Sequence, residues 1–93
     1  MFRSKKILKA AQDADCQSCG RYRPSMAAHA NWQEYGKGYG LKAHDCYVAF
    51  LCQHCHDYVD GRRGAWSNVQ KRELWEKAWR NTILYLFESG IVK

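Results

Sequence analysis

Two pairs of cysteines have the spacing of a tetrahedral metal site. Cys16 and Cys19 form one pair, Cys52 and Cys55 form the other, and each pair encloses two residues. Such a gap lets both sulfurs of one turn bind the same zinc ion at about 2.3 Å, and two such turns complete the tetrahedron without an open position. The spacing therefore predicts a structural zinc site on these four cysteines. The alternative is two unrelated redox or unbound cysteine pairs.

The number of cysteines and the expected compartment also favour metal over disulfides. The chain has five cysteines, an odd number for a disulfide framework. The sequence shows neither a secretion signal nor a membrane span, so we expect a cytoplasmic protein, whose thiols stay reduced. The fifth residue, Cys46, lies in a strand-like run and is predicted to be a small buried apolar side chain.

Three histidines are left for chemistry once the four cysteines are assigned. His56 could replace Cys55 as the fourth zinc ligand, but the two identical spacings favour Cys55. His54 lies between the ligands of the second pair and should point into solvent. This leaves His29, His44 and His56 unassigned. A neutral imidazole near pH 7 can accept a proton from water or bind a metal ion.

The order of these residues resembles that of the HNH, or ββα-metal, nucleases. The zinc-stapled members of that superfamily carry a CxxC pair, a histidine on the first strand, and "LC..CH" at a strand-to-helix junction. Here the elements read "CQSC" (16–19), "AH" (28–29) and "LCQHCH" (51–56). More closely, "AHDCYVAFLCQHCHDYVDGR" (43–62) is similar to small nucleases encoded by lambdoid prophages, which also end in a helix followed by residues like "GIVK". The resemblance covers residues 5–93.

The resemblance implies a metal-dependent endonuclease that hydrolyses the phosphodiester bonds of nucleic acid, with DNA as the expected substrate, in a bacterial host cell. His29 would then be the general base, and His56 would bind a catalytic divalent cation such as Mg²⁺ or Mn²⁺. Asp45 is a third candidate, which would orient His29 or bind the metal. The alternative is that Asp45 is a solvated carboxylate in a loop. His44 is the alternative base.

Two positions depart from the family pattern. Many HNH nucleases carry an acidic metal ligand directly before the base, where this chain has Ala28. The middle asparagine of the pattern would fall near Tyr47. A non-catalytic zinc-containing DNA-binding module is therefore the alternative function, since such a module needs neither His29 nor His56.

The charge of the chain suits a polyanionic partner. Fifteen Lys and Arg against nine Asp and Glu give a net charge of +6, which favours nucleic acid over a membrane as the partner. Contacts to phosphates are predicted for Lys37 and Lys42 in a glycine-rich loop, and for Arg62 and Arg63 after the second cysteine pair.

The periodicity predicts a single α+β domain over residues 1–93. The resemblance implies a small ββα-metal core closed by the zinc site and flanked by an N-terminal helix and a long C-terminal helix. The predicted elements are a helix at 4–12 capped by Ser4, strands within 25–32 and 46–52, a mobile loop at 34–42, a short helix from His56, and a helix at 67–90. The last is the clearest, because Ser67 and Gln70 have capping-box spacing. Its predicted core face consists of Leu74, Trp75, Ala78, Trp79, Thr82, Ile83, Leu86 and Phe87.

Overall fold

The chain folds as a mixed α and β structure around a two-stranded antiparallel sheet. The computed structural model describes residues 1–62, 64 and 66–92. Its elements in chain order are α1 (Lys5–Ala10), β1 (Met26–His29), β2 (Val48–Leu51), α2 (Gln53–Val59) and α3 (Asn68–Glu88), with short 3₁₀ helices at Ala11–Asp13 and Gln33–Tyr35. The predicted helices and both strands are confirmed, whereas an HNH-type core stays a prediction.

The hairpin of β1 and β2 carries hydrophobic side chains on both faces. Met26 pairs with Leu51 at one end and His29 with Val48 at the other. All four residues of β2 are buried. The outer edge of β2 is closed as well, because the Phe50 N–H donates to Thr82 Oγ1 at 3.0 Å and the Phe50 carbonyl accepts from the Gln17 N–H at 2.8 Å. β2 is thus the central element of the fold.

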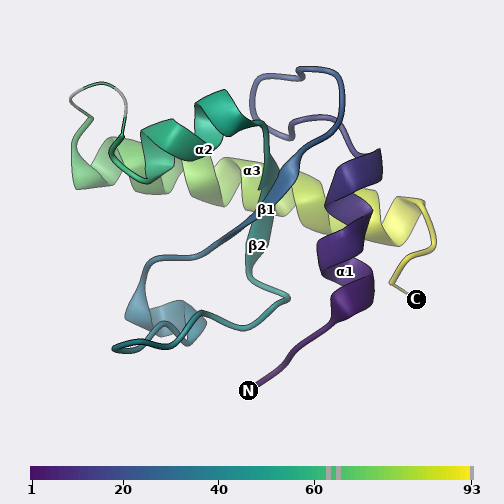
Figure 1. Cartoon of the computed structure of the whole chain (residues 1–93), viewed down its shortest axis with the longest axis horizontal. Helices are drawn as coiled ribbons and strands as arrows, with labels where there is room; N and C mark the ends of the chain where they lie inside the picture. The colour runs from purple at the N-terminus through teal and green to yellow at the C-terminus, as the bar shows by residue number, and fades with distance from the viewer. Residues whose placement is uncertain (63, 65, 93) are drawn as a thin grey trace.

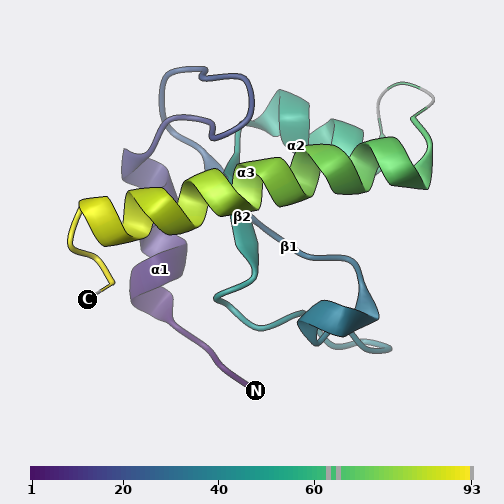
Figure 2. The same cartoon turned by 180° about the vertical axis from the view of Figure 1, so that it is seen from behind.

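A different helix packs on each face of the hairpin, and α3 contributes side chains to the clusters on both faces. Figures 1 and 2 show α3 on one side of the molecule, with α2 and α1 on the other side at opposite ends of α3. Ala49 and Leu51 face a cluster formed with α2 and the first half of α3. Val48 and Phe50 face a second cluster formed with α1 and the end of α3. Successive side chains of β2 therefore point alternately toward the α2 side and the α1 side of the hairpin.

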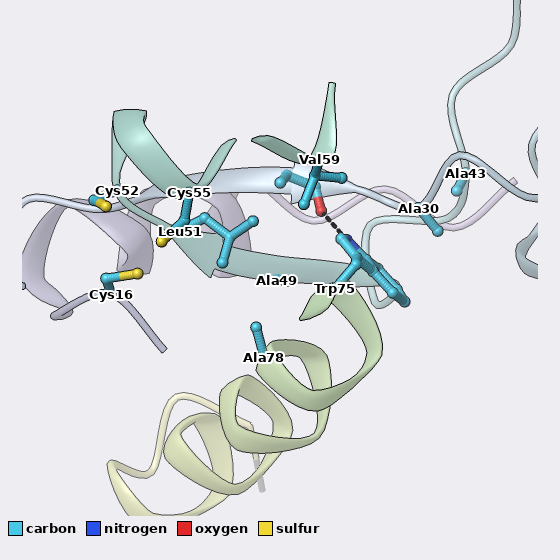
Figure 3. Close-up of a cluster of buried hydrophobic side chains, with 11 residues drawn as sticks. Cys16, Ala30, Ala43, Ala49, Leu51, Cys52, Cys55, Val59, Trp75 and Ala78 are labelled. Atoms are coloured by element: carbon cyan, nitrogen blue, oxygen red, sulfur yellow. Dashed lines mark hydrogen bonds between the residues drawn. The ribbon is translucent and has the colours of Figure 1, made fainter. Parts of the chain in front are cut away.

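α3 follows the predicted pattern at its start and departs from it near its end. The capping box is present, with Ser67 accepting from the Gln70 N–H and Gln70 reaching back to the Ser67 N–H. Trp75 is fully buried and its Nε1–H donates to the Ala28 carbonyl at 2.9 Å (Figure 3). Phe87, predicted in the core, is 57% exposed, because the second cluster buries only its neighbour Leu86 at that turn.

The sequence interpretation placed the start of α2 too late. We predicted a helix from His56, but α2 begins at Gln53 with Cys52 as its N-cap. The second CxxC pair is therefore built into the first turn of the helix, which fixes the spacing of its two sulfurs. Although α3 has 21 residues, none of the helices in the described part of the chain is both long and apolar enough to cross a bilayer.

The glycine-rich loop is anchored at its base by aromatic side chains. The Tyr35 ring lies 5.1 Å from that of Tyr47 and 5.2 Å from that of Trp75. The Tyr35 hydroxyl also donates to Glu76 of α3. Farther along the loop, Gly38 pairs with Leu41, and Tyr39 between them is fully exposed. The loop therefore projects its tip from a packed base.

Candidate four-cysteine metal centre and two histidine–aspartate pairs

The four predicted zinc ligands come together at one end of the α2-side cluster. One sulfur from each of Cys16, Cys19, Cys52 and Cys55 lies within 4.8 Å of every other. The Cys19 and Cys52 sulfurs are 3.7 Å apart, and a tetrahedron with 2.3 Å zinc–sulfur bonds has sulfur–sulfur edges of about 3.8 Å. All five cysteines are free of disulfides. Figure 3 shows the Cys16, Cys52 and Cys55 sulfurs gathered beside Leu51. The cluster can therefore hold a zinc ion.

The first cysteine turn is held by its own backbone. The Cys16 N–H donates to the Arg21 carbonyl at 2.9 Å, and the Gly20 N–H donates to the Cys16 carbonyl at 3.1 Å. Gly20 adopts a φ of 79°, a conformation that side chains other than glycine rarely adopt. The N–H groups of Ser18 and Cys19 point at the Cys16 sulfur from 3.4 Å. This turn presents N–H donors to a thiolate.

The electrostatics of the cluster favour a bound cation. Burial disfavours the Cys16 thiolate, but hydrogen bonds from N–H groups of the two cysteine turns outweigh it and lower its pKa to about 7. Burial raises the pKa of the Cys55 thiol far above its usual value, and the charge of Cys16 raises it further. Burial also raises the pKa of Cys19. Four thiolates therefore cannot coexist here without a positive charge between them, which a divalent ion supplies.

His29 lies against the buried carboxylate of Asp45. The His29 Nε2 and the Asp45 Oδ1 are 2.7 Å apart, with side chains 17% and 4% exposed. The same oxygen accepts from Arg3 Nη1 at 3.1 Å, and Asp45 Oδ2 accepts from the Ser4 N–H at 2.7 Å. Burial alone would raise the pKa of Asp45, but hydrogen bonds from His29, Ser4 and Arg3 outweigh it and lower the pKa. Asp45 is thus an ionised partner that fixes the His29 ring.

The N-terminal segment forms a strap over this pair. Arg3 also donates to the carbonyls of Lys42 and Ala43. The Phe2 N–H donates to His44 Nδ1 at 2.9 Å, so this nitrogen of the alternative base is already engaged. No local sequence signal identifies Arg3 as a site residue, because it meets Asp45 across 42 positions.

His56 lies beside a carboxylate of its own helix. His56 Nδ1 is 3.0 Å from Asp60 Oδ2, one turn farther along α2. The nitrogen is buried and has no hydrogen-bond partner among the described residues, so its close contact with Asp60 does not have the direction of a hydrogen bond. His54 is exposed, as predicted, and packs its ring against Tyr58. His56 Nδ1 and Asp60 Oδ2 are therefore close enough together to bind one cation between them.

The two histidines belong to opposite faces of the hairpin. Alternation along β1 places His29 on the face of Ala27, which packs against the α1-side cluster. His56 belongs to α2, which packs against the face of Ala28. In the described residues, the polar contacts of the two imidazoles go to different aspartates. The structure therefore brings Asp45 to His29 and Asp60 to His56, as two separate pairs.

The predicted phosphate contacts are spread over the surface. Lys42 is exposed and Lys37 is half-buried, both in the glycine-rich loop. The Arg62 side chain is 67% exposed and lies 3.9 Å from both Asp57 and Asp60. Arg63 lies outside the described residues. Arg62 is therefore the predicted cation that adjoins the His56–Asp60 pair.

Comparisons of the whole chain with models of known protein families, with curated proteins and with solved structures found no match.

Proposed function

We propose that this protein is a metal-dependent endonuclease that hydrolyses phosphodiester bonds of nucleic acid, with DNA as the expected substrate. The observation that carries the proposal is the contact between His29 and the buried Asp45. A buried carboxylate that holds one nitrogen of a partly exposed imidazole is a common arrangement for a general base. The resemblance to the HNH nucleases supplies the reaction.

His29 is oriented to accept a proton at one defined atom. Ionised Asp45 can only accept hydrogen bonds, so Nε2 must carry the proton that joins the two side chains. Nδ1 is then left with the lone pair that removes a proton from an attacking water. The charge of Asp45 stabilises the imidazolium that results. General-base catalysis of this kind contributes about 10²- to 10⁴-fold to a rate.

His56 and Asp60 are the residues that would hold the catalytic cation. His56 Nδ1 is buried, has no hydrogen-bond partner in the described part of the chain and lies beside a carboxylate oxygen, an arrangement that fits a divalent ion. Such an ion, when bound, neutralises charge that builds on phosphate oxygens. Arg62 reaches toward the same carboxylate from 3.9 Å, and it would bind a neighbouring phosphate.

The positions of the two pairs constrain how a substrate is bound. Because His29 and His56 lie on opposite faces of the hairpin, a phosphodiester in contact with both must cross the edge of β1. Among the described residues, β2 is the strand that pairs with β1. We therefore propose that the nucleic-acid backbone passes over the outer edge of β1, from one face of the hairpin to the other.

The experiment is a cleavage assay on duplex, branched and single-stranded DNA with Mg²⁺ or Mn²⁺. Wild type should cut at least one of these substrates, and His29→Ala and His56→Ala should not. His54→Ala is the matched control, since His54 is an exposed histidine on the same helix as His56. Excess metal should restore part of the activity of His56→Ala and none of that of His29→Ala.

A zinc-containing module that binds DNA without cutting it is the second candidate. One observation favours it, since Ala28 is only 3% exposed and packs in the core. The position where many HNH nucleases carry an acidic ligand therefore cannot contribute one here. A wild-type protein that binds DNA but cuts none of the substrates with either metal would establish this function in place of the first.

A further inference from the structure

An exposed tyrosine flanked by two arginines projects from the first cysteine turn. Tyr22 is 74% exposed, and Arg21 and Arg23 on either side are exposed too. The Arg23 guanidinium carbon lies 5.1 Å from the centre of the Tyr22 ring. An exposed ring between two cationic side chains offers a surface on which a base can stack beside donors that can contact a phosphate.

The backbone around Tyr22 is fixed on both sides. The Arg21 carbonyl accepts from the Cys16 N–H at 2.9 Å, which ties it to the metal centre. The Arg23 N–H and Nε–H both donate to Asp15 Oδ1, at 3.1 and 3.4 Å. Tyr22 is thus presented from a short segment held at both ends, and little ordering is required when a ligand binds.

The segment borders a hollow that reaches the start of α2. Its volume is about 340 Å³ and its lining is Arg21, Tyr22, Arg23, Pro24, Cys52 and Gln53. Two guanidinium groups, a phenol ring and a carboxamide can contact a phosphate and stack on a base. We propose that this hollow, the knuckle site, binds a nucleotide of a nucleic-acid strand.

The knuckle site lies in line with the His56–Asp60 pair. Gln53, His56 and Asp60 recur at three- and four-residue spacing, so they lie on one side of α2. The Gln53 side chain also donates to Asp57 on that side, at 2.6 Å. From Gln53 to Asp60 the helix rises about 10 Å, which equals about three nucleotide steps of 3.4 Å measured along the axis of a stacked DNA strand. The knuckle site therefore holds the strand about three nucleotides from the bond that is cut. This distance rests on the proposed function, whereas binding at the knuckle does not.

Binding is measured without added Mg²⁺ or Mn²⁺, by fluorescence anisotropy of a labelled single strand and a labelled duplex with the zinc-loaded protein. Tyr22→Ala should weaken binding by about 5- to 160-fold, the range expected for one lost base–aromatic stack. Tyr22→Phe should bind like wild type, because it keeps the ring. Phe87→Ala is the matched control, an exposed aromatic at the far end of α3, and should change nothing. Arg21→Ala should lower the salt dependence of binding by about one phosphate contact.

Equal affinity of Tyr22→Ala and wild type for both DNA probes would overturn the knuckle site. A polyglutamate peptide is tested as a competitor. If the peptide displaces the DNA from wild type, and if Tyr22→Ala weakens peptide binding as much as it weakens DNA binding, the site takes an acidic protein and the proposal is overturned. If wild type cuts no DNA but Tyr22→Ala still weakens binding, the cleavage proposal fails and the knuckle site stands. A photo-reactive phenylalanine derivative incorporated in place of Tyr22, which keeps the aromatic ring, should mark nucleotides about three steps from the cut. Adducts opposite the cut would refute that spacing.

Discussion

Removal of zinc should unfold most of this protein, and the structure indicates why. Cys16, Cys52 and Cys55 are 3%, 4% and 5% exposed and belong to the same buried cluster as Leu51 and Trp75. Without the ion, the cluster leaves thiols whose ionised forms repel one another inside the core. Structural zinc contributes about 10–16 kcal/mol in zinc-finger peptides, against about 5–15 kcal/mol for the net stability of a whole domain. The free energy of unfolding should therefore fall to about zero.

The assay combines zinc content with thermal unfolding followed by circular dichroism. Native protein should release one zinc per chain to a chromogenic chelator and lose its cooperative transition as it does so. Cys55→Ser should behave like the metal-free protein. Cys46→Ser is the control, because Cys46 is half-buried and lies outside the four-sulfur cluster, and it should keep its zinc and its midpoint. A metal-free protein that unfolds cooperatively at the wild-type midpoint would refute the reasoning.

Two further predictions concern groups that support the site. Thr82→Val removes the oxygen that accepts from the Phe50 N–H on the buried edge of β2, and chemical denaturation should show a loss of about 1–3 kcal/mol; an unchanged midpoint would contradict that role. Asp45 has a lowered pKa in the folded protein, so its charge stabilises the fold above its unfolded-state pKa of about 3.9. That stabilisation is lost as the pH falls through the lower folded-state value. In excess zinc, the difference in free energy of unfolding between wild type and Asp45→Asn should stay constant from about pH 8 to about pH 5.5, where zinc is still bound and Asp45 is ionised in both states. If the difference in free energy of unfolding between the two proteins disappears near pH 6, a group other than Asp45 is responsible for it.

Local features of the fold were predictable because their signals lie within a few residues. The capping box at Ser67 and Gln70 is a four-residue pattern, and it marks the start of α3 correctly. The CxxC spacing constrains each pair of sulfurs within a single turn. Even here the start of α2 was predicted late, because Cys52, a predicted metal ligand, also stands at the N-cap of the helix.

Long-range features of the candidate site were not predictable from the sequence. Arg3 meets Asp45 across 42 positions, and no spacing rule connects them. The separation of His29 and His56 onto opposite faces follows from the pleat of β1 and from which face α2 covers. The first can be inferred from strand alternation, but the second depends on how the helices pack. Phe87 shows the same limit, since helical spacing gives its direction but not the extent of the cluster it faces.

The most direct test of the central claim is chemical rescue of the proposed base. The rate of DNA cleavage by His29→Ala is measured in single-turnover conditions with Mg²⁺ or Mn²⁺, with and without added imidazole. The account predicts that the variant is inactive and that imidazole restores cleavage, more strongly as the pH rises and more of the imidazole is neutral. It also predicts that His54→Ala cuts at the wild-type rate without imidazole. Cleavage by His29→Ala at the wild-type rate would contradict the assignment of His29 as the base.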